Sequence, residues 1–444
     1  MNGNAEPKAL VQIISEENFL PFVQNFCPDF FKVYNLFKSL VEDKAEISKK
    51  LYSHLIQEVE FLESFLDEHG ARENKTWYFF AEYVASIRNL GIAAFFLKHL
   101  MDRYPCYRLL EPEDSQKKFY ADSQDTLNFL NQSVLNLFQE TVAVGKINGL
   151  VFPEKSMLPD DFPEFQSNTV LPRNISEDQV KGEEEWVVDL CEKIQKVAGM
   201  MSETSINLSA DAAARKKLII ENINEKNARM YANLIHSAQS DFDTYIKNTR
   251  IEQKYPSLKN IRGYISISLH LMEIVLWLSH FYERHEDDIR QGECKKKISD
   301  LVDKTRLLSI VLNFGFYYSQ FYIQEGGKLS EEILNRIVKT VRYEAPIPKP
   351  HGFHARPSTY ISLIARKHDK NIFLIVDGEK YNVRSVMSLL QAGGMIADKG
   401  YQKVVFEGER KAIDDIRVLA EHNYCENSDI PPQLSYLTSL KTPA

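Results

Sequence analysis

The sequence predicts a multidomain protein in which an all-α helical bundle region is followed by a small α+β domain. Three observations lead to this fold class. A chain of 444 residues exceeds the size of one ordinary hydrophobic core. Across residues 1–340, glycine and proline are sparse and apolar residues recur at steps of three and four, which is typical of amphipathic helices. After residue 340, short β-branched and aromatic runs end at glycines, which is typical of strands and turns.

The composition is that of a soluble globular protein, with 44% hydrophobic and 26% charged residues. The formal net charge of −8 argues against a general nucleic-acid binder, so no nucleic-acid partner is expected. No signal peptide and no apolar run of roughly 20 residues is evident, which predicts a cytoplasmic protein without a membrane span. The cysteines are scattered and form no CxxC pair, which fits a reducing compartment and predicts neither disulfides nor a zinc site. They are Cys27, Cys106, Cys191, Cys294 and Cys425.

Residues 1–150 are the first half of the predicted helical region. Two apolar stripes in it predict helices that bury one face and leave the other in water. The first stripe is Leu51, Leu55, Val59 and Leu62, and the second is Tyr83, Ile87, Leu90, Ala94, Leu97 and Met101. Residues 151–186 hold four prolines and little periodicity, so they predict a linker or irregular excursion before a second helical half at residues 187–340.

The two helical halves align without gaps over residues 79–104 and 260–285. The alignment pairs Tyr83 with Tyr264 and His99 with His280. Either an internal repeat of one helical bundle unit or a chance similarity between two amphipathic helices explains it.

His99 and His280 each lie three residues before an acidic residue, so each pair shares one helix face. One interpretation is a metal site built from these residues. The favoured interpretation is a solvated position or a hydrogen bond between helices, and we predict no metal site.

The small domain is predicted at residues 341–424, with its elements in the order β-α-β-β-α-β-α. NIFLIVDG and QKVVFEG are its clearest strands, and the helices between the strands are expected to cover a mostly antiparallel sheet. Its net charge is +3, whereas residues 1–340 carry −10. The tail, residues 425–444, is predicted to be a flexible end or a strap over another domain.

His354 stands directly before a helix that is predicted from Ala355 to about His368, with Pro357 in its first turn. The free backbone N–H groups of Ala355 and Arg356 and the positive end of the helix dipole would stabilise a phosphate there. Arg356 adds a permanently charged planar group, and imidazole is a good nucleophile near neutral pH. Taken alone, these residues fit a phosphoryl-accepting histidine and a plain N-cap histidine equally well.

The run GFHARP at residues 352–357, followed by a helix, two strands and NVRSVM at residues 382–387, resembles HPr. HPr is the histidine phosphocarrier of the bacterial phosphoenolpyruvate:sugar phosphotransferase system. The resemblance covers about residues 341–424 and implies the HPr-like open-faced β-sandwich fold. It also implies that an Enzyme I-like donor phosphorylates His354, that Arg356 stabilises the phosphate, and that a histidine of an Enzyme IIA-like (EIIA-like) protein receives the group.

By the same resemblance, Ser385 matches the serine that an HPr kinase/phosphorylase modifies in many bacteria. It is also an N-cap candidate for a helix predicted from Val386 to about Gln391, so regulation and plain capping stay open. The resemblance assigns partner docking to an apolar patch, part of which is expected to be core. The patch is Val386, Met387, Leu389 and Leu390.

Two features depart from ordinary HPr. Residues 385–400 form a segment about three residues longer, which weakens the expectation that a standard Enzyme I recognises the domain. His351 lies three residues before His354, where it either tunes the phosphorylated histidine or is merely exposed, and the second interpretation is favoured.

Together these features predict a phosphocarrier and regulatory protein, in which His354 passes a phosphoryl group on or uses it as a switch for the fused helical region. The alternative is a non-transferring adaptor whose HPr-like domain is a binding module controlled through Ser385. An enzyme within the helical region is disfavoured, because that region has no glycine-rich phosphate loop, HExxH or GxSxG motif. No cofactor is expected, and the partner of the helical region is not identified by its sequence.

Overall fold

The computed structural model describes residues 13–163, 183–208, 211–286, 293–337, 340–368 and 372–439. The chain divides into two units, Met1–Glu331 and Glu332–Ala444, which are called here the helical unit and the small unit. The expected linker at residues 151–186 lies largely, at residues 164–182, outside the described residues. Residues 151–163 are described and contain one short 3-10 turn at Pro159–Asp161.

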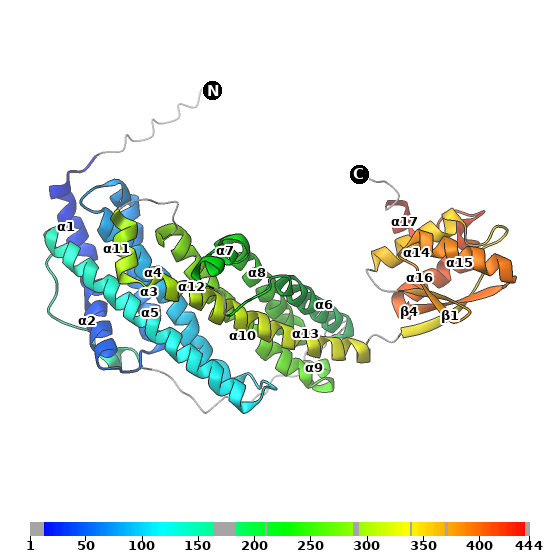
Figure 1. Cartoon of the computed structure of the whole chain (residues 1–444), viewed down its shortest axis with the longest axis horizontal. Coiled ribbons are helices and arrows are strands. Elements are labelled where there is room, and N and C mark those ends of the chain that lie inside the picture. Colours follow the sequence, from blue (N-terminus) through cyan, green and yellow to red (C-terminus); the bar gives the residue numbers. More distant parts are fainter. Residues whose placement is uncertain are drawn as a thin grey trace, which may run out of the picture. The chain divides into compact units, whose positions relative to one another are not determined.

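The helical unit is all-α, as the sequence predicts (Figure 1). Its first helices are α1 (Glu16–Phe26), α2 (Pro28–Glu42), α3 (Lys49–Glu68), α4 (Tyr78–Arg103) and α5 (Glu113–Ile147). The later helices are α6 (Glu183–Ser202), α7 (Ala212–Asn222), α8 (Glu225–Asp241), α9 (Arg250–Lys254), α10 (Ser257–Phe281), α11 (Glu293–Leu301), α12 (Lys304–Ser309) and α13 (Tyr317–Ile337). Short 3-10 or π segments extend or join them, namely η1 (Ala71–Glu73), η2 (Tyr104–Cys106), η4 (Phe242–Ile246), η5 (Tyr282–Glu286) and η6 (Ile310–Phe316).

Helices α4 and α10 form the centre of the helical unit, where α4 packs against α3, α5 and α10, and α10 packs also against α8 (Figure 1). Both helices are long and apolar enough to cross a membrane, but 83% and 78% of their most apolar windows are buried inside the unit. They are therefore read as core helices. Every residue of the two predicted stripes is buried, which confirms the predicted periodicity. The aligned segments 79–104 and 260–285 thus form two helices in contact, and their origin as a repeat stays a prediction.

The small unit has the predicted order of elements, and its four strands form an antiparallel sheet with the order β1-β4-β2-β3. The strands are β1 (Thr340–Pro346), β2 (Phe373–Val376), β3 (Glu379–Asn382) and β4 (Lys403–Glu409). The helices are α14 (Ala355–Lys367), α15 (Val386–Lys399) and α16 (Arg410–Glu421). The strands contribute alternate residues to one core shared with the helices, among them Leu374 and Phe406. The helices pack against one face of the sheet, which confirms the predicted open-faced β-sandwich.

The second predicted helix of the small unit is longer than expected. It was expected to end near Gln391, but α15 continues to Lys399 and ends at Gly400, whose φ is +66°. Two glycines inside the segment made it look like a helix end. Gly393 instead allows a close approach, because a Cβ there would lie 2.7 Å from the carbonyl oxygen of Phe353.

The tail packs on the small unit itself. Its described part contains the short elements η7 (Asn423–Cys425), η8 (Pro432–Leu434) and α17 (Tyr436–Ser439). Leu434 and Leu437 are fully buried in the same core as the strands and helices, and the Tyr436 hydroxyl donates to Asp415 Oδ2 at 2.6 Å. The described part of the tail is therefore a strap over the unit that it follows.

Candidate functional site

His354 caps the N-terminus of α14, as the sequence predicts. The chain turns at Gly352, whose φ is +66°, and reaches His354 in an extended conformation. The Nδ1 atom of His354 accepts the backbone N–H of Arg356 at 3.4 Å, while its carbonyl oxygen accepts the N–H of Ser358 at 3.2 Å. One ring nitrogen therefore faces the positive end of the helix dipole, where a negatively charged group is stabilised.

The other ring nitrogen of His354 faces a carboxylate that the sequence analysis missed. Oε1 of Glu426 lies 2.9 Å from Nε2 of His354, and the Glu426 side chain is 7% exposed against 37% for the histidine. Arg356 is tied to the same residue, because its Nη1 donates to the Glu426 carbonyl oxygen at 3.1 Å. The two nitrogens of the imidazole ring are thus electrostatically distinct, one beside backbone N–H groups and one beside a buried carboxylate.

Residues just after α16 hold the loop that carries His354. The Asn423 side chain bonds both backbone groups of Lys349, at 2.9 Å from its N–H and 2.7 Å to its carbonyl oxygen. The Tyr424 hydroxyl donates to the Pro346 carbonyl oxygen at 2.8 Å, and its ring lies against Phe353 with centroids 5.6 Å apart. No local motif identifies these residues, although an asparagine at a helix end is a common left-handed residue.

The remaining predicted residues around the histidine lie as follows. Ala355 is the first residue of α14, and Arg356 is exposed at the surface. His351 is also exposed, and its ring centroid is 5.9 Å from that of His354. The structure therefore brings His354, Arg356 and His351 together at one end of α14.

Ser385 is the N-cap of α15, where its Oγ accepts the N–H of Ser388 at 3.2 Å. In the docking patch predicted after it, Met387 is 73% exposed and Val386 and Leu390 are half-buried. Leu389 is fully buried in the core of the small unit, which agrees with the expectation that part of the patch is core. The exposed part of the patch is the side of α15 that carries Val386, Met387 and Leu390.

The capping role of Ser385 can be measured directly. Replacement of Ser385 by alanine is expected to destabilise the start of α15 by about 1 kcal/mol, because the Ser388 N–H loses its acceptor. Amide hydrogen exchange in peptides from residues 386–392 of the full chain should then speed up roughly fivefold. Ser385→Asp is the matched control, since aspartate caps equally well and should keep the wild-type rate. Equal exchange in all three proteins would show that the cap contributes nothing.

The two histidines considered for metal binding lie in different surroundings. His280 Nδ1 pairs with Glu225 Oε2 of α8 at 2.9 Å, which is the contact between helices favoured from the sequence. His99 Nδ1 lies 3.3 Å from the Lys49 ammonium. Among the described residues, no group of three or more His, Cys, Asp or Glu side chains could hold a metal ion.

Comparison with known proteins agrees with the geometry of the small unit. The family model PTS-HPr, described as the phosphorylation site of the HPr component of the phosphotransferase system, matches residues 341–421. No curated protein and no solved structure matches the chain. The match covers the sheet, α14, α15 and α16, and it ends before Asn423, Tyr424 and Glu426. The chain therefore carries a C-terminal HPr-like domain, and no family-model match covers the helical region.

Proposed function

We propose that His354 accepts a phosphoryl group from an Enzyme I-like donor and yields it to a histidine of an EIIA-like protein. The observation that carries the proposal is the placement of Nδ1 of His354 at the N-terminus of α14, facing the N–H of Arg356. Backbone N–H groups and the helix dipole favour a dianion at this position without any cofactor.

The geometry favours Nδ1 as the reacting atom. A phosphoryl group on Nε2 would meet the Glu426 carboxylate, whose oxygen is 2.9 Å from that nitrogen, and two negative groups repel each other strongly at such a distance. In the transfer, the lone pair of Nδ1 forms a bond to phosphorus while the P–N bond of the donor phosphohistidine breaks. The donor imidazole keeps the electron pair of the broken bond. The same exchange, with His354 as the leaving group, passes the phosphoryl group on.

Arg356 supports the proposed phosphorylated state. Its guanidinium is held beside the site by the Glu426 carbonyl oxygen, which uses one of its five N–H donors. The other donors are able to bind phosphate oxygens in a planar, bidentate manner. We assign Arg356 to phosphate stabilisation and the exposed part of the α15 patch to partner docking.

Intact mass spectrometry after incubation with phosphoenolpyruvate and an Enzyme I from the same cell tests this function. We expect one phosphate on the wild-type chain, labile in acid and stable in base, and none on His354→Ala. His351→Ala is the matched control, because it removes a neighbouring histidine whose ring centroid is 5.9 Å away and should keep full labelling. Acid-labile phosphate on His354→Ala, or its loss from His351→Ala, would contradict the assignment.

The fused helical unit favours a regulatory role beside transfer, because a simple phosphocarrier does not need an additional unit of residues 1–331. We propose that phosphorylation of His354, in the cytoplasm where such donors act, changes what the helical unit binds. Limited proteolysis and partner binding with and without the phosphate test this role, and identical patterns would contradict it. Ser385 is exposed at the start of α15 and offers a second point of control to an HPr kinase/phosphorylase, as in the adaptor alternative.

A further inference from the structure

A cavity of about 570 Å³ in the helical unit concentrates positive charge. Its lining includes six lysines and arginines but two carboxylates, a net charge of +4. They are Lys49, Arg103, Arg108, Lys247, Lys259 and Arg262, against Asp243 and Glu252. Residues 1–340 as a whole carry a net charge of −10, so this grouping opposes the charge of the surrounding unit. Fields of one sign in a concave site attract ligands of the opposite sign.

Both carboxylates of the cavity already have partners. Asp243 receives two bonds from the Arg262 guanidinium, at 3.0 and 2.7 Å. Glu252 Oε2 accepts the N–H of Asn248 at 2.9 Å. Arg103, Arg108 and Lys259, in contrast, are exposed, and no carboxylate of the described residues lies within ion-pair distance of them. Their charges are available to a ligand.

The backbone at Arg108, one of these cations, is fixed by contacts with α10. Arg108 has a φ of +54°, which is unusual for a residue other than glycine. Its carbonyl oxygen accepts the side-chain amide of Asn260, and Tyr264 Oη accepts the N–H of Leu110 at 3.2 Å. At Gly263 a Cβ would lie 2.3 Å from the Tyr107 carbonyl oxygen, so the turn is packed directly on α10. The left-handed backbone at Arg108 is therefore held by contacts on both of its sides.

Two histidines, His99 and His270, line the cavity. The rings of His99 and His270 meet edge to face with centroids 4.7 Å apart, and Nδ1 of His270 is buried with no hydrogen-bond partner among the described residues. Burial, together with His99, Arg262 and Lys49, lowers the pKa of His270 to about 3. Burial and the cations Lys49 and Arg103 lower the pKa of His99 too. Both rings are uncharged at neutral pH, and each could donate an N–H to an anion.

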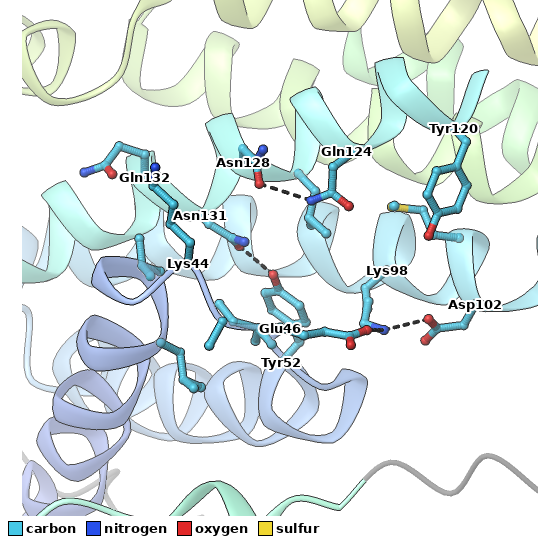
Figure 2. Close-up of a pocket in the computed structure, with 16 residues that line it drawn as sticks. Lys44, Glu46, Tyr52, Lys98, Asp102, Tyr120, Gln124, Asn128, Asn131 and Gln132 are labelled. Atoms are coloured by element: carbon cyan, nitrogen blue, oxygen red, sulfur yellow. Dashed lines mark hydrogen bonds and ion pairs between the residues drawn. The ribbon is translucent and has the colours of Figure 1, made fainter. Parts of the chain in front are cut away.

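A second cavity in the same unit, of about 700 Å³, provides a comparison (Figure 2). Its charged side chains balance, because Lys44 and Lys98 face Glu46 and Asp102. Lys98 is bonded to both carboxylates, at 2.8 and 2.6 Å. Figure 2 also shows two pairs of neutral polar side chains, Tyr52 with Asn131 and Gln124 with Asn128. The excess of positive charge is thus a property of the first cavity and not of cavities in this unit generally.

We propose that the basic cavity binds a small molecule that carries two phosphate groups. Each phosphate carries a charge of about −1.5 to −2 at neutral pH, so two of them match the net charge of the lining. Arginine and lysine are the side chains that bind phosphates, and Tyr107 and Phe242 supply apolar surface for the organic part. A free molecule is favoured over a lipid headgroup, since the net charge of −10 over residues 1–340 would repel an anionic membrane.

Pyrophosphate is the probe for this site, used with the full chain, titration calorimetry and the NMR signals of the histidine rings. We expect saturable binding that shifts the His99 and His270 signals and raises the pKa of His99. Arg103→Gln, Arg108→Gln and Lys259→Gln should each weaken binding about tenfold, because each removes a charged hydrogen-bond donor. The side chains are exposed, so the variants should fold, and circular dichroism checks this.

Two control variants separate this site from other anion-binding positions. Lys44→Gln removes a lysine from the charge-balanced cavity, and His354→Ala alters the helix N-terminus of the small unit. Both should bind pyrophosphate in the basic cavity as the wild type does, with the same shifts of the His99 and His270 signals. Absence of saturable binding at millimolar pyrophosphate, or binding that follows Lys44 or His354 rather than the three cations, would overturn the proposal. Absence of binding would leave the proposal for His354 unaffected, so the two proposals fail independently.

Discussion

Replacing Arg72 by alanine is expected to lower the free energy of unfolding of the helical unit by about 3 kcal/mol. The Arg72 guanidinium contacts three carboxylates, Asp67 at 2.7 Å, Glu63 at 2.8 Å and Glu82 at 2.9 Å. The side chains of Glu63 and Glu82 are 6% and 3% exposed, and Arg72 supplies part of the positive charge that balances them, beside Arg88 at 2.7 Å from Glu63. Glu82 also bonds Nδ1 of His285 at 2.8 Å, which connects α3, η1 and α4 to η5.

The expected effect is large because buried negative charge remains in the fold after Arg72 is removed. Burial raises the pKa of Glu63, while Arg88 and Arg72 oppose that rise. Without Arg72, the buried carboxylates of Glu63 and Glu82 keep less balancing positive charge, although Arg88 still pairs with Glu63 at 2.7 Å. Keeping these charges buried or protonating them then costs free energy. A solvent-exposed ion pair has no such penalty, because water replaces the lost partner.

Urea unfolding followed by tryptophan fluorescence measures this effect in the full chain, because Trp77, Trp186 and Trp277 all lie in the helical unit. Arg229→Ala is the matched control, since Arg229 is 53% exposed, pairs with Glu225 at 2.9 Å, and should change stability by about 0.5 kcal/mol or less. Adding Glu82→Gln to Arg72→Ala should recover part of the loss, because it removes one of the buried negative charges that Arg72 balances. Equal effects of the Arg72 and Arg229 substitutions would show that the network contributes no more than a surface pair.

The helices and strands of this protein could be predicted because their signals are local. The stripe from Leu51 to Leu62 repeats at helical spacing, and its residues are all buried. The strand at residues 373–376 likewise shows the alternation that places Leu374 in the core. The end of α15 was missed because Gly393 serves a contact with Phe353, which lies 40 positions earlier in the chain. Local propensity cannot distinguish a glycine that ends a helix from one that allows close packing.

In the candidate site, too, the residues with a local sequence signal could be predicted and the distant ones could not. His354 and Arg356 belong to a run of six residues that carries its own helix cap, so local sequence was sufficient. Glu426 reaches the histidine from more than 70 positions away, and only the path of the chain after α16 places it there. The basic cavity was even less predictable from local sequence, because its cations come from five separate places in the chain. These are α3, α4, the loop after η2, the residue after η4, and α10. A net charge of −10 over residues 1–340 gave no sign of it.

Replacing both Leu434 and Leu437 by alanine is expected to destabilise the small unit by about 4 kcal/mol. Both leucines are fully buried in the core of the small unit, with 0% of their surface accessible to solvent. They lie beyond residues 341–421, which the family model matches. Each truncation removes apolar surface and leaves a cavity that the surrounding helices fill only in part. Since small domains are stable by about 5–15 kcal/mol, this loss is a large share of the total.

Hydrogen exchange in the full chain isolates the effect, because tryptophan fluorescence reports only on the other unit. The slowest amides of β2 should exchange about a thousandfold faster in the double variant, since 1.4 kcal/mol corresponds to a factor of ten. Met387→Ala is the control, because Met387 is 73% exposed and its truncation leaves no cavity. Phosphorylation of His354 should fall as well, because the strap leads back to Asn423 and Glu426, which hold the histidine loop and face its ring. Unchanged exchange would mean that residues 341–421 are stable without the strap, and that its contacts serve the site alone.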